Sequence, residues 1–301
     1  MTQLSHKRQS WRFNVEPNEA GKRLDQIVSA RTGLSRRKTR EILKFGGVQM
    51  NRRRIRVAGR TPESGAEIFV TLDSALGAEP DIKPEVLFED DWVLALNKPA
   101  GIPTQGTQAS DRHDFFAVVR RCYVGQDLHL VHRLDTGTSG IILLAKGAGA
   151  AGEIGRAFRT HDVKKTYLAA IPGNLETCVL EMPIGRISNT RPTRFGCADG
   201  LIDVKPATTN FYQIDTPVAP VGIELPDANW VAAEPLTGRT HQIRVHLAHL
   251  GNPVIGDVFY GGLPSKRLWL HAWKLELPHP ITGEPIRIQT EICDSFMYNT
   301  I

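Results

Sequence analysis

One carboxylate in the chain stands in a setting that suits nucleophilic or acid–base chemistry. The sequence HRLD at 132–135 follows an apolar run and leads into the small residues TGTSG, which would let a substrate approach the backbone. Arg133 is close by, and the segment THQIR at 240–244 supplies a further arginine. A neighbouring guanidinium favours an ionised Asp135, ready as nucleophile or base. An aspartate that begins such a turn is more often structural, so the local sequence leaves both roles open.

Other local patterns resemble known sites but lack a required part. Glycines 147, 149 and 152 form GxGxxG after an apolar strand, yet the next strand ends at 171–174 without the acid that a dinucleotide site needs. The DTG at 135–137 has no second copy, so one chain cannot build the paired carboxylates of an aspartic protease. His241, His246 and His249 lack HExxH spacing and are expected to be solvated or to face RNA. GxxxxGK[ST] does not occur. We therefore expect no metal ion, ATP or nicotinamide cofactor.

The basic residues are concentrated near the start of the chain. Residues 1–80 contain 16 Lys and Arg against 8 Asp and Glu, whereas residues 81–301 contain 21 against 24. Within 31–60, 11 basic residues accompany a single acid, Glu41. A cationic face without interleaved acids attracts polyphosphate, because each neutralised phosphate releases condensed counterions. The segment favours a nucleic-acid partner over a solvated helix without a ligand.

Length and composition predict a folded chain of one large domain and one small one. Of 301 residues, 41% are apolar and 23% are charged, which excludes a disordered tail. The four cysteines (122, 178, 197 and 293) form no CxxC pair, which suits a reducing compartment. The N-terminus is polar, and no apolar run approaches the roughly 20 residues of a membrane span. A cytoplasmic protein is expected.

The basic segment reads as a small module of two helices and a β-hairpin. Leu24, Ile27 and Val28 have helical spacing, and Gly33 ends that helix. A second helix is expected from a cap at Ser35 to about residue 45, followed by strands at 48–50, 55–57 and 68–72. One face of the second helix would carry Arg36, Arg40 and Lys44, with Arg37 beside them. Such a face could lie against the phosphates of structured RNA.

A larger domain is expected after a Gly/Ala/Pro-bearing linker at 74–84. Strand-like runs lie at 92–96, 129–134, 140–145, 166–171, 207–214 and 230–233, and helical stretches at 148–161 and 240–250. This order predicts an α+β fold, with a large, mixed and mainly antiparallel sheet and flanking helices.

Six ordered segments resemble those of RluA-type pseudouridine synthases, which isomerise uridine in large-subunit rRNA or tRNA. The string HRLDTGTSGIILLAK is similar to the family signature, and FEDDWVLALNKPAGIPT to its opening strand and turn. Four more segments follow in the family's order: VKKTYLAAIPG, VKPATTNFYQI, PLTGRTHQIRVHLAHLGNPVIGDVFYG and LHAWKLELPHPITGE. The stretch RLDQIVSARTGLSRRKTREILKFGGVQMN resembles the αL-motif (S4-like) RNA-binding module. The resemblance implies an S4-like domain at 13–73, the linker at 74–84 and a catalytic domain at 85–301.

The resemblance also implies roles for individual residues. Asp135 would be the catalytic aspartate, Tyr167 the tyrosine against the target base and Arg244 the arginine that pairs with the aspartate. Arg239 is a second candidate for that cation. Substrate or RNA binding would involve Arg133, Arg239, Arg36, Arg37, Arg40 and Lys44.

The implied activity is isomerisation of uridine, most naturally in large-subunit rRNA, by a monomer without a cofactor. The alternative is a non-catalytic RNA-binding factor of ribosome assembly. The stretch RISNTRPTRFGCADG at 186–200 departs most from the family pattern. We expect it to contact RNA, because Arg186, Arg191 and Arg194 cluster there.

Overall fold

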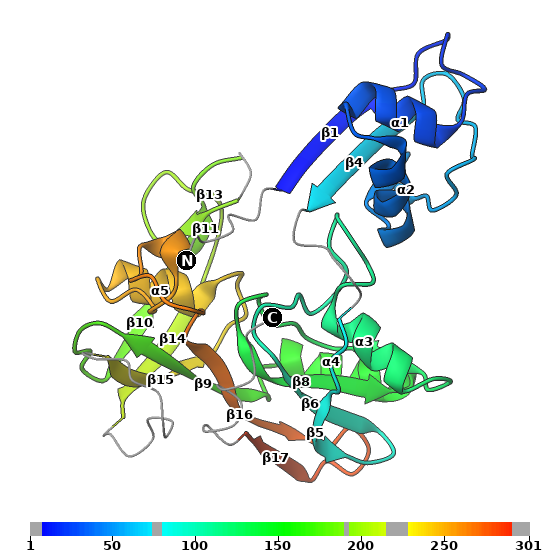
Figure 1. The fold of residues 1–301 in the computed structure, drawn as a ribbon. Helices are drawn as coiled ribbons and strands as arrows, with labels where there is room; N and C mark the ends of the chain where they lie inside the picture. Colours follow the sequence, from blue (N-terminus) through cyan, green and yellow to red (C-terminus); the bar gives the residue numbers. More distant parts are fainter. Residues whose placement is uncertain (1–7, 74–79, 190–192, 215–227, 291–301) are drawn as a thin grey trace. The chain divides into compact units, whose positions relative to one another are not determined.

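The computed structural model describes residues 8–73, 80–189, 193–214 and 228–290, which fall into two units (Figure 1). The first combines Met1–Lys83 with Pro103–Val124, and the second combines Pro84–Ile102 with Gly125–Ile301. The sequence assigned 103–124 to the larger domain, whereas the structure groups these residues with the N-terminal ones. Arg191 and part of the expected linker lie outside the described residues.

The first unit packs two helices on an antiparallel sheet. Helices α1 (Leu24–Thr32) and α2 (Arg36–Phe45) precede the short strands β2 (Val48–Met50) and β3 (Arg53–Arg54). The sheet order is β1-β4-β2-β3, with β1 at Arg8–Asn14 and β4 at Glu67–Asp73. Leu24, Ile27, Val28, Ile42 and Leu43 pack with the sheet in one core.

The predicted helix ends of this unit are confirmed. Gly33 follows α1 with a φ of 73°, and the Ser35 hydroxyl accepts a hydrogen bond from the backbone N–H of Lys38 at the start of α2. The strand expected at 55–57 is wrong, because the hairpin turns early, at 51–52, and its second strand is β3. The unit also contains α3 (Phe115–Cys122), capped by Asp114, which the sequence analysis missed.

The second unit is built on a ten-stranded sheet, so the predicted mixed and mainly antiparallel α+β fold is confirmed. Its main path is β10-β14-β15-β9-β16-β8-β6-β5, with β17 beside β16 and β7 beside β8. The pairing of β16 with β8 is parallel and the other pairings are antiparallel. The strands are β5 (Glu85–Glu89), β6 (Val93–Lys98), β7 (Leu128–Leu130), β8 (Ser139–Lys146), β9 (Lys164–Ile171), β10 (Cys178–Glu181), β14 (Thr208–Gln213), β15 (Asn229–Pro235), β16 (Leu270–Pro278) and β17 (Pro285–Gln289).

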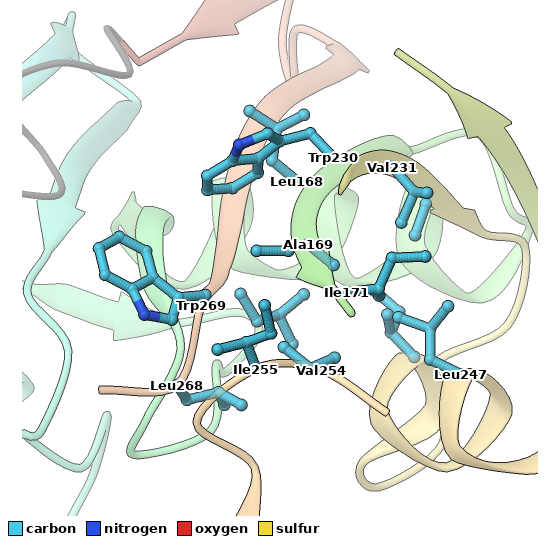
Figure 2. Packing of buried hydrophobic residues seen from close by; sticks show 14 of the residues in the cluster. Leu168, Ala169, Ile171, Trp230, Val231, Leu247, Val254, Ile255, Leu268 and Trp269 are labelled. Carbon is cyan, nitrogen blue, oxygen red and sulfur yellow. The ribbon is translucent and has the colours of Figure 1, made fainter. Parts of the chain in front are cut away.

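Two helices cover this sheet, and each packs on its own hydrophobic cluster. Helix α4 (Ala148–Arg159) begins after Gly147, the first glycine of the GxGxxG pattern, and buries Ile154 among side chains of β6, β8 and β16. Helix α5 (Gln242–His249) buries Leu247 against β9 and β15, in the cluster that also contains Trp230 and Trp269 (Figure 2). None of the helices in the described ranges has the length and apolar composition to cross a bilayer.

A small three-stranded sheet, β12-β11-β13, is inserted between β10 and β14. Its strands are β11 (Ile184–Arg186), β12 (Phe195–Gly196) and β13 (Ile202–Lys205). The stretch at 186–200 begins at the last residue of β11 and includes β12. A 3₁₀ turn, η1 (Val258–Tyr260), follows α5 in the chain and lies against it.

Candidate active site

A pocket of about 160 Å³ in the second unit gathers the predicted catalytic residues. Asp135 enters it from the turn between β7 and β8, Tyr167 from β9 and Arg244 from α5. Arg133 and Arg239 line the same pocket. Residues far apart in the sequence therefore meet around one carboxylate, whose side chain is 30% exposed.

Arg244 bridges two carboxylates. Its Nη1 lies 3.3 Å from Asp135 Oδ2, while its Nε and Nη2 donate to the two oxygens of Asp257 at 2.6 and 2.8 Å. The guanidinium also lies over the Tyr260 ring, 5.1 Å from its centroid. Burial lowers the pKa of Arg244, but Asp257 and Asp135 outweigh burial and raise it above its usual value. Because buried Asp257 accepts from both Nε and Nη2 along one edge of the guanidinium, Arg244 has one orientation toward Asp135.

Arg239 does not take this place. Its Nε donates to the carbonyl of Pro206 at 2.9 Å, at the rim of the pocket. Of the two candidate cations, Arg244 is therefore the one whose guanidinium faces the aspartate.

The turn that presents Asp135 is fixed from beneath by a buried lysine. The backbone N–H of Thr138 donates to the Asp135 carbonyl at 3.1 Å, which closes the turn. Lys98, fully buried at the end of β6, donates to the carbonyls of Pro99 and Ile102 at 2.8 Å and of Thr136 at 3.5 Å. Burial lowers the pKa of Lys98 to about 7, although the charge of Asp135 acts in the opposite direction. Lys98 thus ties the NKPAG turn to the residue after Asp135.

The strand expected at 129–134 ends early, and a histidine explains why. Strand β7 pairs with β8 only as far as Leu130 opposite Leu144. Two residues later, His132 Nε2 accepts a hydrogen bond from the backbone N–H of Leu143 at 2.9 Å. This side-chain bond takes the place of further backbone pairing between β7 and β8, so the backbone is free to turn. Burial lowers the pKa of His132 to about 3, so the ring is neutral and can accept this bond.

The glycines of TGTSG serve packing against the protein. A Cβ on Gly140, whose φ is +107°, would lie 2.2 Å from the carbonyl oxygen of Ala272 on β16. A Cβ on Gly137 would lie 3.1 Å from Leu268. The small residues were expected to admit substrate, but at these two positions they let neighbouring strands and side chains approach.

Tyr167 lies in the middle of the sheet, opposite Ala233 on β15 and Ala272 on β16. Burial, and then the charge of Asp135, raise the pKa of its phenol above the usual range, so the ring stays neutral. Lys165, two residues before it on the same face of β9, also lines the pocket, and burial lowers its pKa. Tyr167 also lines the pocket, beside Asp135.

His241 is a pocket residue that adopts a left-handed conformation, with a φ of 58°. Its Nδ1 lies 2.7 Å from Tyr260 Oη, and its Nε2 lies 3.8 Å from Asp135 Oδ2. Tyr260 Oη also accepts the backbone N–H of Phe195. Burial lowers the pKa of His241 despite Asp135. A neutral imidazole therefore faces the carboxylate.

Comparison with known proteins assigns this site to a family. Residues 92–249, which include Asp135, Tyr167 and Arg244, match the family model described as RNA pseudouridylate synthase. The chain belongs to this family. It is 35% identical to the tRNA pseudouridine synthase C of Salmonella typhi, over 71% of this chain and 87% of that protein. It is 30% identical to the ribosomal large subunit pseudouridine synthase C of Yersinia pestis, over 93% of this chain and 91% of that protein.

A solved structure agrees with the assignment. The human RNA pseudouridylate synthase domain containing 1 is 29% identical and superposes with a TM-score of 0.58, covering 71% of this chain and 86% of that one. The predicted RluA-type membership is thus confirmed, and with it the enzyme class, an RNA uridine isomerase.

Three residues that support the synthase pocket escaped the sequence analysis. Asp257, Tyr260 and Lys98 lie within segments quoted for the family resemblance, GDVFYG and NKPAG. No local pattern distinguished them, because their contacts around Arg244 and Asp135 come from distant elements. Of the three histidines considered together in the sequence, His241 lines the pocket, His246 is fully buried between Thr209 and the Met182 carbonyl, and His249 is exposed. The expectation that these histidines are solvated or face RNA is therefore wrong for His246.

In the first unit the basic helix face is organised around one buried aspartate. Asp25, fully buried, accepts from Arg23 at 3.1 Å, Arg36 at 3.1 Å and Arg40 at 2.9 Å. Burial raises the pKa of Asp25, but the hydrogen bonds from Arg40, Arg23 and Arg36 hold it well below its usual range. Arg37 and Lys44, whose side chains form no ion pair with other described residues, are exposed. Arg36 and Arg40, two of the predicted RNA ligands, are thus already paired with Asp25. The cluster remains strongly cationic, because three arginines share a single carboxylate.

Proposed function

We propose that this synthase converts uridine to pseudouridine in large-subunit rRNA, with Asp135 as the catalytic carboxylate. The observation that carries the proposal is the Arg244 bridge, which aims a half-exposed Asp135 into a pocket beside Tyr167. Family membership supplies the reaction, and the pocket supplies the residues for it.

The reaction is an isomerisation within one nucleotide. The N1–C1′ bond breaks, the detached uracil rotates, C5 bonds to C1′, and the proton that leaves C5 is balanced by one gained at N1. A carboxylate can serve either by attacking C1′ or by removing a proton from the sugar, and both steps place it against the ribose. The Arg244 guanidinium would hold its oxygens toward that sugar, with the His241 imidazole beside them.

Tyr167 is proposed to hold the base. A uridine in folded RNA must first leave its stack, which costs a few kcal/mol. Stacking on an aromatic ring returns roughly 1–3 kcal/mol. The phenol is protonated at neutral pH because its pKa is raised, so it faces the base without adding negative charge.

The extent of the similarity supports a ribosomal substrate. The relative named for tRNA has the higher identity but matches 71% of this chain, whereas the relative named for the large ribosomal subunit matches 93%. A match of that length has to include most of the N-terminal unit, with its cationic Asp25 cluster. We propose that this unit binds RNA as an S4-like module through Arg37, Lys44 and the paired arginines. At the rim of the active-site pocket, Arg133 and Arg239 are proposed to contact the substrate. The enzyme is proposed to work as a cytoplasmic monomer.

Single-turnover conversion of a large-subunit rRNA transcript tests this proposal. The wild type should form pseudouridine without added metal or nucleotide, and Asp135→Asn should slow the reaction by about 10³-fold or more while RNA affinity is retained. Asp127→Asn is the matched control, because Asp127 is an exposed aspartate of the same unit outside the pocket. A near-normal rate for Asp135→Asn would refute the assignment of the carboxylate. Conversion of tRNA but not of the rRNA transcript would refute the substrate.

A further inference from the structure

A second pocket adjoins the active-site pocket. It has a volume of about 260 Å³ and lies between the small sheet β12-β11-β13 and the turn at 238–240. Gly238, Arg239 and Thr240 line both pockets, so the two hollows share this turn as a wall. A chain that fills one of them can pass over the turn into the other.

The side chains of the second pocket are mainly cationic. Arg186, Lys205 and Arg239 line it together with a single acid, Asp203, which pairs with Arg186. Lys205 is exposed and forms no ion pair with any residue in the described part of the chain. Arg239 is held in place by its bond to the Pro206 carbonyl, with its remaining N–H groups available. The excess of positive charge suits a phosphate.

An aromatic ring completes the pocket. Phe195 on β12 lines it and is half-buried, with a face on which a nucleobase could stack. The backbone N–H of Phe195 donates to Tyr260 Oη, which in turn bonds His241 beside Asp135. Two hydrogen bonds therefore link the second pocket to His241, whose Nε2 lies 3.8 Å from Asp135 Oδ2.

We infer that the second pocket binds the nucleotide next to the target uridine, with its phosphodiester group on Lys205, Arg186 and Arg239 and its base against Phe195. This inference rests on the proposed function, because it assumes that the target uridine fills the Asp135 pocket. Its consequence is that part of the selection among uridines is made at the flanking position, by the small sheet and the turn at 238–240.

The test is a double-mutant cycle of RNA affinity, in which one positive charge of the protein and one phosphate charge of the RNA are removed singly and together. The probe is an RNA hairpin with a single loop uridine, in which a neutral methylphosphonate replaces the linkage on either side of that uridine in turn. Affinity is measured by fluorescence anisotropy for Asp135→Asn, which blocks turnover, with and without Lys205→Ala. Arg287→Ala is the control, since Arg287 is an exposed cation on β17 that lines neither pocket.

At one of the two linkages, the methylphosphonate should weaken binding by up to about fivefold when Lys205 is present, as expected for an exposed charge pair. The same replacement should have no effect with Lys205→Ala, and Arg287→Ala should behave like its parent. Lys205→Ala should also flatten the slope of log affinity against log salt by about one. An equal loss with and without Lys205 at both linkages would overturn the inference. Failure of the wild type to convert uridine would instead refute the proposed function, because the binding cycle does not depend on turnover.

Discussion

Asp257→Asn isolates the contribution of the buried carboxylate that aims Arg244. The substitution keeps the shape of the side chain and one carbonyl oxygen, but it removes the charge and turns one acceptor into a donor. Arg244 Nε and Nη2 now donate to the two oxygens of Asp257 at 2.6 and 2.8 Å. In the variant an amide N–H₂ would oppose one of these N–H groups. The guanidinium must then rotate or lose a bond, and its Nη1 would leave Asp135.

The expected magnitude follows from the geometry. A hydrogen bond to a charged group contributes about 1.5–3 kcal/mol, and one such bond is lost. If the full loss appears when Asp135 meets the ribose, the single-turnover rate falls by roughly 10- to 150-fold. The side chains of Arg244 and Asp257 are only 12% and 1% exposed, so water cannot substitute for the missing acceptor. The rate loss should be smaller than that of Asp135→Asn, because the carboxylate itself remains.

Two measurements separate positioning from stability. Single-turnover rates at saturating RNA give the catalytic effect, and denaturant unfolding gives the change in the free energy of unfolding. Glu276→Gln is the matched control, since it breaks an exposed pair with Arg287 whose contribution is at most about 1 kcal/mol. A wild-type rate for a folded Asp257→Asn protein would show that Arg244 needs no buried anchor, and the positioning argument would fail.

Two further predictions concern charge in each unit. Because the pKa of buried Lys98 falls from its usual 10.5 to about 7, the unfolded chain binds this proton over a pH range in which the folded chain has lost it. The free energy of unfolding should therefore rise with pH from about 7, by up to ~1.4 kcal/mol per unit, and this rise should be missing from denaturant melts of Lys98→Met. In the first unit, the double variant Arg37→Ala, Lys44→Ala should reduce the slope of log RNA affinity against log salt by about two and leave the free energy of unfolding unchanged. Removing Arg36 and Arg40 should instead destabilise the unit, because Asp25 would remain buried with only Arg23 as a partner. An unchanged salt slope in the first variant, or an unchanged melt in the second, would contradict these expectations.

Patterns local in the sequence predicted most of the fold. Helical spacing, the Ser35 cap and the glycine stop at Gly33 fixed α1 and α2, because capping depends on residues a few positions apart. The apolar runs of β8, β9 and β15 were found for the same reason. The sequence analysis did not place β1, β5, β10, β16, β17, the three strands of the small sheet or helix α3. Strand β1, for example, is largely exposed.

The candidate site residues and the pairing of Arg244 with Asp135 were predicted, but the contacts that support them were not. Asp135, Tyr167 and Arg244 came from the family resemblance, and the structure puts them in one pocket. Their supporting contacts could not be predicted, because Lys98 and Asp257 act over long sequence separations. The pairing of Arg36 and Arg40 with Asp25 was missed for the same reason. Helical spacing predicts that the two arginines share one face, but only the fold brings Asp25 to that face.

The charge distribution of the second unit suits the reaction proposed for Asp135. In that proposal a carboxylate meets a ribose that is flanked by two phosphates, and like charges repel. Arg133, Lys165, Arg239 and Arg244 line the pocket around Asp135, so cations outnumber the acids there even when buried Asp257 is included. Only Arg244 is committed to the carboxylate, because Asp257 fixes its orientation. The remaining cations face the pocket and its rim, where they can balance the RNA backbone while Asp135 keeps its charge for the sugar.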